Sequence, residues 1–171
     1  MLRLILRPVG VDDEGAVLAA QAAMRDDGFT FAPGYRADRA WPDFLARLAE
    51  QARAVEVPGF VPVTFLVAVV GTTIVGRTSV RHRLNDSLLA MGGHIGYGVL
   101  RDHRRQGHAT EILRQSLVIA RSLGVDRALL TCDDDNVGSV RTIERCGGVL
   151  ENIVDDGSGV AKRRYWLDMP S

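Results

Sequence analysis

Apolar residues alternate with polar ones in several short stretches of the chain. Alternation over residues 2–7 predicts a short strand, and the β-branched runs 63–70 and 72–82 predict two longer strands. Gly71 separates these two runs, so we expect them to form an antiparallel hairpin. Residues 94–100, HIGYGVL, predict another strand, whose glycines would weaken it unless a bulge or a closely approaching ligand uses the space.

Apolar residues recur at steps of three and four in other segments. This spacing predicts helices over residues 12–27, 41–55, 107–123 and 136–147. Residues 127–132, 149–154 and 162–169 have the pattern of three further strands. The element order is therefore β-α-α-β-β-β-α-β-α-β-β, with no linker or repeat between the elements. We expect one mixed α/β domain over residues 1–171.

The charge balance excludes some classes of partner. Lys and Arg together number 21, as do Asp and Glu, so no long-range field would attract nucleic acid or an anionic membrane. The apolar run Val61–Val70 is far shorter than the roughly 20 residues that cross a bilayer. The first residues lack the pattern of a signal peptide. We therefore expect a soluble cytoplasmic protein that binds neither nucleic acid nor a membrane.

The two cysteines, Cys132 and Cys146, form no CxxC pair and belong to no Cys/His cluster with zinc spacing. We expect both to be reduced, buried thiols in a reducing compartment. No metal site is predicted, because the consecutive carboxylates of residues 133–135 would not all face one ion.

The stretch RRQGHATEIL, residues 104–113, has the composition of an anion-binding turn. A glycine and a small residue, Gly107 and Ala109, fall at the start of a predicted helix that follows a strand. The first N–H groups of a helix lack internal acceptors and carry partial positive charge, so they bind phosphates well. Arg104 and Arg105 would add charge. Basic turns with a glycine also occur for structural reasons, and these residues alone leave both interpretations open.

The pattern Arg104-x-x-Gly107-x-Ala109 resembles the Q/R-x-x-G-x-G/A motif of the GNAT superfamily of acyl-CoA-dependent N-acetyltransferases. A second stretch, NVGSVRTIERCGGV, is similar to the family's N-x-x-A/S pattern, and the element order is the family's order. The stretches GGHIGYGV and CDDDNVGSVRTIE resemble a bacterial subgroup of acetyltransferases. The resemblance implies the GNAT fold, with a mixed, mostly antiparallel central sheet flanked by helices.

The same resemblance implies acetyl-CoA as the acyl donor. Its diphosphate would bind the amides of residues 106–110, and its pantetheine arm would pair with the strand that ends at Val99. The residues expected to contact it are Gly98, Val99, Leu100, Arg104, Arg105, Gln106, Gly107, His108, Ala109, Thr110, Asn136 and Ser139. His103 is expected in the loop beside the donor. Asn136 has a second interpretation, as the cap of the helix that it precedes.

The family transfers the acetyl group directly to an amine, here a primary amine of a small molecule or peptide. An N–H near Val99 would stabilise the oxyanion. Many relatives carry a Tyr that protonates the departing thiolate, but the corresponding residue in this chain is Ile143. Tyr97 and Tyr165 are the candidates to replace it, and each also fits the role of a buried structural aromatic.

Removal of the amine proton needs a base or a water path, because an alkyl amine is almost fully protonated at neutral pH. His94 is the first candidate, since imidazole titrates in the useful range. Asp133 is the second, with capping of the following helix as its alternative role. His82 and Glu56 are further candidates, and a histidine on a strand is more often a packed or surface residue.

The resemblance places the acceptor pocket between residues 28–41 and 155–166, but it does not identify the acceptor. The missing tyrosine supports a second hypothesis, a module that senses acyl-CoA without turnover. A structural domain without a CoA site is the third. Pairing with a second copy of the chain, as in many relatives, is also left open.

Overall fold

The protein, seen here as a computed structural model, is described over residues 3–53, 59–155, 157 and 159–169. Its strands are β1 (Leu4–Arg7), β2 (Val63–Val70), β3 (Thr73–Arg81), β4 (Ile95–Val99), β5 (Arg127–Asp133), β6 (Val149–Asp155) and β7 (Ala161–Asp168). Its α-helices are α1 (Glu14–Met24), α2 (Trp41–Gln51), α3 (His108–Ser122) and α4 (Val137–Arg145). This order confirms the predicted one. Val55 and Glu56 lie outside the described residues.

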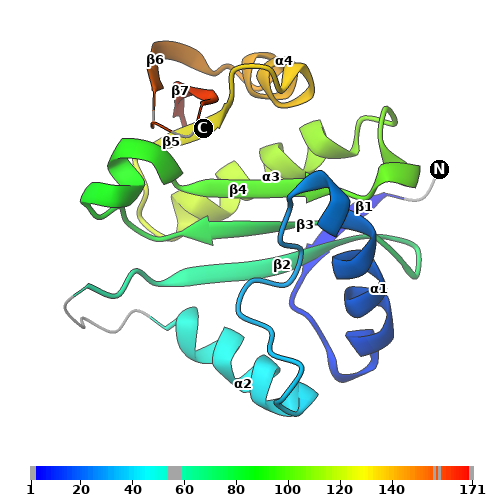
Figure 1. Cartoon of the computed structure of the whole chain (residues 1–171). Helices are drawn as coiled ribbons and strands as arrows, with labels where there is room; N and C mark the ends of the chain where they lie inside the picture. The colour runs from blue at the N-terminus through cyan, green and yellow to red at the C-terminus, as the bar shows by residue number, and fades with distance from the viewer. Residues whose placement is uncertain (1–2, 54–58, 156, 158, 170–171) are drawn as a thin grey trace.

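Two sheets form the centre of the molecule (Figure 1). One has the strand order β1-β2-β3-β4 and the other β5-β7-β6, and every pair of neighbouring strands in them is antiparallel. The predicted hairpin is confirmed, because Val70 pairs with Thr73 across Gly71. The sequence predicted one central sheet, and the structure divides its strands between two.

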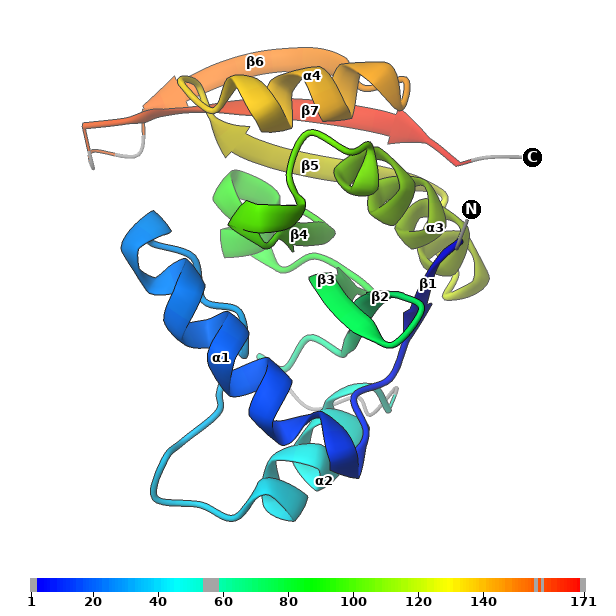
Figure 2. The same cartoon turned by 90° about the vertical axis from the view of Figure 1, so that its right-hand side faces the viewer.

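Helices cover both faces of the first sheet, with α1 on one side and α3 on the other (Figure 2). On the α1 side, Phe31, Trp41 and Phe44 pack with Phe65 and Val67 of β2 in a buried cluster. On the α3 side, aliphatic residues of the helix pack against β3, β4 and the second sheet. Successive residues of a strand point to opposite faces, so each strand serves both cores.

The two sheets meet at the beginning of β4. The His94 N–H donates to the Leu129 carbonyl at 2.7 Å, and the Leu129 N–H donates back to His94 Nδ1 at 2.9 Å. Beyond this point β4 and β5 belong to different sheets. The edge of β4 therefore lacks a partner strand from β5 as the strand approaches Val99. Within the described residues, no helix is both long and apolar enough to span a membrane.

Candidate functional site

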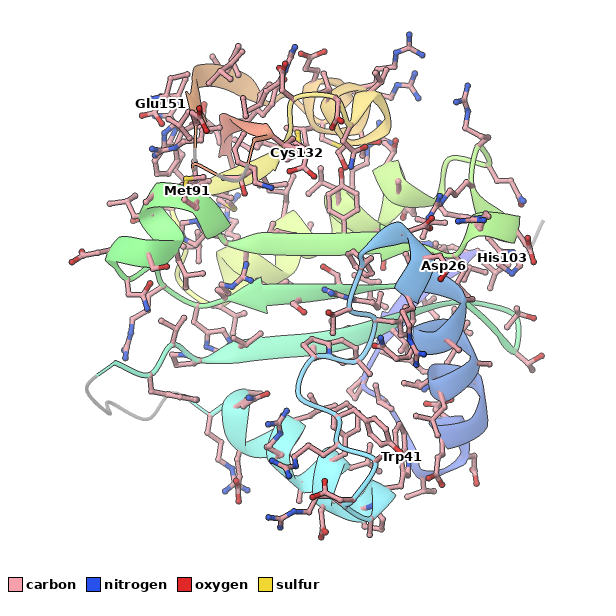
Figure 3. All side chains as sticks on the ribbon, in the orientation of Figure 1. Asp26, Trp41, Met91, His103, Cys132 and Glu151 are labelled. Atoms are coloured by element: carbon pink, nitrogen blue, oxygen red, sulfur yellow. The ribbon has the colours of Figure 1, made fainter. Side chains whose placement is uncertain are left out.

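A cavity of about 780 Å³ lies between the end of β4, the turn that leads into α3 and the first residues of α4. The end of α1 and the residues after it form the remaining wall. Figure 3 shows His103, which lines the cavity, and Asp26, which precedes the lining residue Asp27, at the same edge of the molecule. The lining residues are Met24, Asp27, Phe29, Tyr97, Gly98, Val99, His103, Arg104, Arg105, Gly107, His108, Ala109, Thr110, Asn136, Val137, Gly138, Ser139, Arg141, Thr142 and Arg145.

The turn before α3 has an unusual backbone. Arg105 has a φ of 63° and is the one non-glycine residue of the described chain with a positive φ. Gly107 follows with a φ of 84° and directly precedes the helix. Left-handed residues in a turn can aim successive N–H groups at one point, and the first amides of α3 have no acceptor inside the helix. The turn therefore presents backbone donors where the sequence predicted a diphosphate.

The charges around the cavity also favour an anion. His103, Arg104, Arg105, His108, Arg141 and Arg145 line it, whereas Asp27 carries the one carboxylate among its described lining residues. Burial and the nearby His103 both lower the pKa of His108, so its imidazole is more readily neutral than a free one. A bound phosphate would favour the charged form of the same ring.

The Arg104 side chain binds acceptors within the protein. Its Nε donates to the Val99 carbonyl oxygen at 3.1 Å, and its Nη2 pairs with the Asp27 carboxylate. Asp27 also pairs with Arg101, and hydrogen bonds from Arg101 and then Arg104 lower the pKa of Asp27. Arg104 therefore links the end of β4, the turn and the end of α1.

The edge of β4 that faces the cavity has backbone groups that do not pair with β3, although the Val99 carbonyl accepts from Arg104. The Leu100 N–H donates to the Val75 carbonyl at 2.9 Å, and Arg77 of β3 pairs with Gly98. Because backbone groups alternate in direction along an antiparallel strand, those of Val99 and Tyr97 point away from β3 and toward the gap. An extended ligand can therefore add to this edge as a strand would.

At the start of α4, Asn136 caps the helix, because its Oδ1 accepts from the Ser139 N–H at 3.0 Å. Both residues also line the cavity, so capping and ligand contact are compatible here. Ile143, by contrast, is 1% exposed and packs in the core between the sheets. The missing tyrosine is thus replaced by a core residue.

Residues 3–149 match the family model of the acetyltransferase (GNAT) domain. This protein belongs to the GNAT acetyltransferase family. Membership assigns it acetyl transfer as its general class of activity. A search of curated protein sequences gave no significant match.

Solved structures show the same GNAT fold. RimJ of Mycobacterium smegmatis, in complex with CoA-disulfide, has a TM-score of 0.71 and 18% identity, covering 96% of this chain and 81% of RimJ. The protein yncA of Salmonella typhimurium, with its cofactor acetyl-CoA, has a TM-score of 0.64 and 16% identity, covering 98% of this chain and 95% of yncA. The microcin C7 self-immunity acetyltransferase MccE, with acetyl-CoA and AMP, has a TM-score of 0.64 and 20% identity, covering 96% of this chain and 92% of MccE.

The structure brings most of the expected donor contacts of this GNAT domain together. All of them line the cavity except Leu100 and Gln106. The Leu100 amide is used in the β3 pairing, and the Gln106 side chain lies 3.4 Å from the Asp102 carbonyl. The cavity wall after α1, with Asp27 and Phe29, was not predicted from the sequence. Arg141 and Arg145 were not predicted either, although their spacing of four residues on a predicted helix places them on one face.

Among the catalytic candidates, Tyr97 lines the cavity. Its hydroxyl is buried and has no hydrogen-bond partner in the described part of the chain. Burial raises the pKa of Tyr97 to about 12, and the nearby Ser139 and Thr142 only partly offset this effect. Buried hydroxyls are normally paired, so an unpaired one beside a cavity is a candidate ligand contact.

His94 lies outside the cavity lining, in the contact between the two sheets. Since its Nδ1 accepts a hydrogen bond from Leu129, the neutral ring carries its proton on Nε2. Burial and the charge of Arg81 lower the pKa of His94. This tautomer leaves no free ring nitrogen to accept a proton from an amine. The role of His94 as a base stays a prediction from the sequence.

Asp133 and Tyr165 also lie outside the cavity lining. Asp133 forms an ion pair with Lys162 across the β5–β7 pairing. Tyr165 is fully buried, and its hydroxyl donates to Glu144 Oε1 at 3.1 Å. Both side chains therefore have structural partners in the second sheet and α4.

The remaining candidate bases are His82 and Glu56. The His82 Nε2 lies 2.8 Å from the Thr64 hydroxyl, and Glu56 lies outside the described residues. His103, expected in the loop beside the donor, lines the cavity. The described part of the chain holds no group of three or more His, Cys, Asp or Glu side chains able to bind a metal ion. Both cysteines are free and half-buried, and burial raises the pKa of each.

Proposed function

We propose that this protein is an acetyl-CoA-dependent N-acetyltransferase that moves an acetyl group directly to a primary amine of a small molecule or peptide. The cavity carries this proposal, because it joins an anion-binding turn at one end to the free edge of β4 at the other. CoA has this same arrangement of chemistry, with phosphates at one end and an amide-containing arm at the other. The solved relatives that contain acetyl-CoA or a CoA disulfide support the choice of donor.

The residues present fit CoA. The amides of His108, Ala109 and Thr110 begin α3 and would receive the diphosphate, with the dipole of a 15-residue helix behind them. Arg141 and Arg145 lie on the opposite wall and would pair with the phosphates or the adenosine side of the donor. The pantetheine amides would pair with the backbone of Tyr97 and Val99, which places the thioester near the end of β4.

In the reaction, the amine nitrogen attacks the thioester carbonyl carbon, the carbon–sulfur bond breaks, and the amine proton ends on the thiol of CoA. The Val99 N–H would donate to the oxyanion that forms during the attack. The cavity contributes by holding both reactants in one place, which removes much of the entropy cost of their encounter. No lining carboxylate is free to act as a base, since Asp27 is paired with two arginines. We therefore propose that water carries the amine proton away.

Tyr97 would assist the departing sulfur. Its phenol stays protonated at neutral pH, because its pKa is raised to about 12. A thiolate of pKa about 8.5 is too weak a base to take that proton fully. Tyr97 would instead donate a hydrogen bond to the sulfur as negative charge develops there, and so take over the part of the missing tyrosine.

The test is release of the CoA thiol from acetyl-CoA in the presence of a panel of primary amines, with the acetylated product identified by mass spectrometry. Turnover with at least one amine supports the proposal. The buried Ile143 favours a second candidate function, an acyl-CoA sensor. Micromolar CoA binding without turnover on any amine would favour that sensor, and no thermal shift with millimolar CoA would contradict both.

A further inference from the structure

Arg77 of β3 is a buried cation without a carboxylate partner. The residue is 7% exposed. Its Nη1 donates to the Ser79 hydroxyl at 3.1 Å and to the Gly96 carbonyl at 3.2 Å, and its Nη2 donates to the Thr30 carbonyl at 2.6 Å. Its Nε is buried and has no partner among the described residues. The guanidinium is therefore held in place by neutral acceptors and keeps one donor unused.

Arg81 lies four residues further along β3, on the same face of the sheet. Its Nη1 donates to the carbonyls of Gly93 at 3.0 Å and Gly92 at 3.4 Å. These two glycines directly follow Met91, which Figure 3 labels. Neither arginine forms an ion pair with any carboxylate of residues 3–53, 59–155, 157 or 159–169. Two cations thus share one face of β3 without a described counter-charge.

Such an arrangement is costly, because water is removed from a charge and no anion replaces it. Burial, and to a smaller extent the charge of Arg81, together lower the pKa of Arg77 to about 10. Burial also lowers the pKa of Arg81. The chain tolerates this cost on β3, beside the strand that forms one wall of the cavity.

Gly96, whose carbonyl Arg77 binds, has room for a Cβ. A Cβ on Gly96 would meet one described atom within 4 Å, Arg77 Nη1 at 3.8 Å. A Cβ on Gly98 would instead lie 2.5 Å from the Phe29 ring. That ring lines the cavity and also stacks on the Arg77 guanidinium, 4.3 Å from its centroid. Arg77 pairs with Gly98 through the backbone, but its guanidinium reaches the Gly96 carbonyl, three residues before Val99 and the proposed place of reaction.

We infer that Arg77 and Arg81 bind an anionic group, a carboxylate or a phosphate, on the amine that this protein acetylates. The inference rests on the proposed acetyl transfer and names the class of acceptor. Gly96 and Val99 are separated by about 10 Å of extended strand, at roughly 3.3 Å per residue. The acceptor therefore carries its anion several bonds away from its amine, as an ω-amino acid does and an α-amino acid does not.

The first experiment compares matched amines. We expect the wild-type protein to acetylate 6-aminohexanoate with a kcat/KM at least about tenfold above that for hexylamine, which has the same chain length and no anion. A separate arm with 6-aminohexyl phosphate distinguishes a phosphate from a carboxylate. Equal kcat/KM values for all three amines would overturn the inference and leave acetyl transfer in place.

The matched variants are Arg77→Gln and Arg83→Gln. Arg83 is exposed two residues after the end of β3, where its Nη2 donates to the Phe60 carbonyl. We expect Arg77→Gln to bring the ratio of the two kcat/KM values close to one, and Arg83→Gln to keep the wild-type ratio. A ratio that survives Arg77→Gln and the corresponding Arg81→Gln would contradict the assignment.

A binding measurement covers the case in which Arg77→Gln does not fold. Adipate and inorganic phosphate are titrated into the wild-type complex with CoA, and binding is followed by NMR shifts of the backbone amides near Arg77 and Gly96. We expect saturable shifts with at least one of the two anions. Shifts without turnover on any amine would retain the anion site and reject the proposed function, whereas no shifts with either anion would reject the site.

Discussion

The Arg104 guanidinium donates to the carbonyl oxygen of Val99, across the turn that separates β4 from α3. The residue that opens the GNAT motif thereby fixes the end of the strand on which the thioester is proposed to lie. In the proposed complex, donor binding and placement of the reacting carbonyl would both depend on this one side chain. The motif arginine has a structural task in addition to its charge.

Arg104→Ala removes this hydrogen bond, the ion pair with Asp27 and one positive charge from the cavity. We expect the Kd for CoA to rise about 10- to 100-fold, since hydrogen bonds that involve a charged group contribute about 1.5–3 kcal/mol. Isothermal titration calorimetry gives the value. The control is Arg114→Ala, which removes an exposed arginine of α3 outside the cavity lining. Equal increases in the Kd for CoA in the two variants would show that Arg104 acts only through its positive charge.

Gly107→Ala places a side chain on a residue with a φ of 84°. The left-handed conformation costs a non-glycine residue roughly 1–2 kcal/mol. The turn is therefore expected to change conformation, so that its N–H groups no longer point toward the expected position of the diphosphate. We expect CoA affinity to fall about tenfold or more. Gly124→Ala is the matched control, because Gly124 ends the same helix with a φ of 86° and open space around it. It should lose similar stability in a thermal melt and keep CoA affinity.

Tyr97→Phe removes a buried hydroxyl that has no described partner. We expect kcat to fall about 10- to 100-fold through loss of a hydrogen bond to the departing sulfur. The free energy of unfolding should rise by up to about 1 kcal/mol, because an unsatisfied buried polar group disappears. Steady-state kinetics and denaturant unfolding measure the two effects.

Tyr165→Phe provides the contrast, since its hydroxyl is paired with Glu144. We expect this variant to lose about 1 kcal/mol of stability. A larger loss of kcat in Tyr165→Phe than in Tyr97→Phe would exchange the roles proposed for the two tyrosines.

CoA affinity should increase as the pH falls from about 7.5 to 5.5. Burial and His103 lower the pKa of His108 in the free protein, so the ring is neutral at the upper end of this range. A phosphate near the ring favours its charged form and raises that pKa on binding, so binding takes up a proton. Calorimetry in buffers of different ionisation enthalpy detects this uptake. His108→Gln should remove much of it, and an unchanged uptake would assign the proton to another group.

Local patterns predicted the element order, the hairpin at Gly71 and the turn at Gly107, because each depends on residues near in sequence. The division into two sheets was not predictable in this way. It arises from strand pairing between segments far apart in sequence, and the two sheets meet through the reciprocal contact of His94 with Leu129, which are 35 residues apart. The same holds for the cavity wall, where Asp27 reaches Arg101 across 74 residues. Tyr97 and Tyr165 were equal candidates from sequence, and only tertiary packing distinguishes a tyrosine beside the cavity from one in the core.

Gly98 and Phe29 occupy complementary volumes, since a methyl group on the glycine would overlap the aromatic ring. The two residues can therefore be changed together by protein engineering. Phe29→Leu would enlarge the space above β4 near Arg77, and Gly98→Ala combined with Phe29→Leu would return part of that volume from the strand side. Because neither substitution changes the turn before α3, the range of accepted amines would change while the proposed binding of the donor's phosphates stays the same.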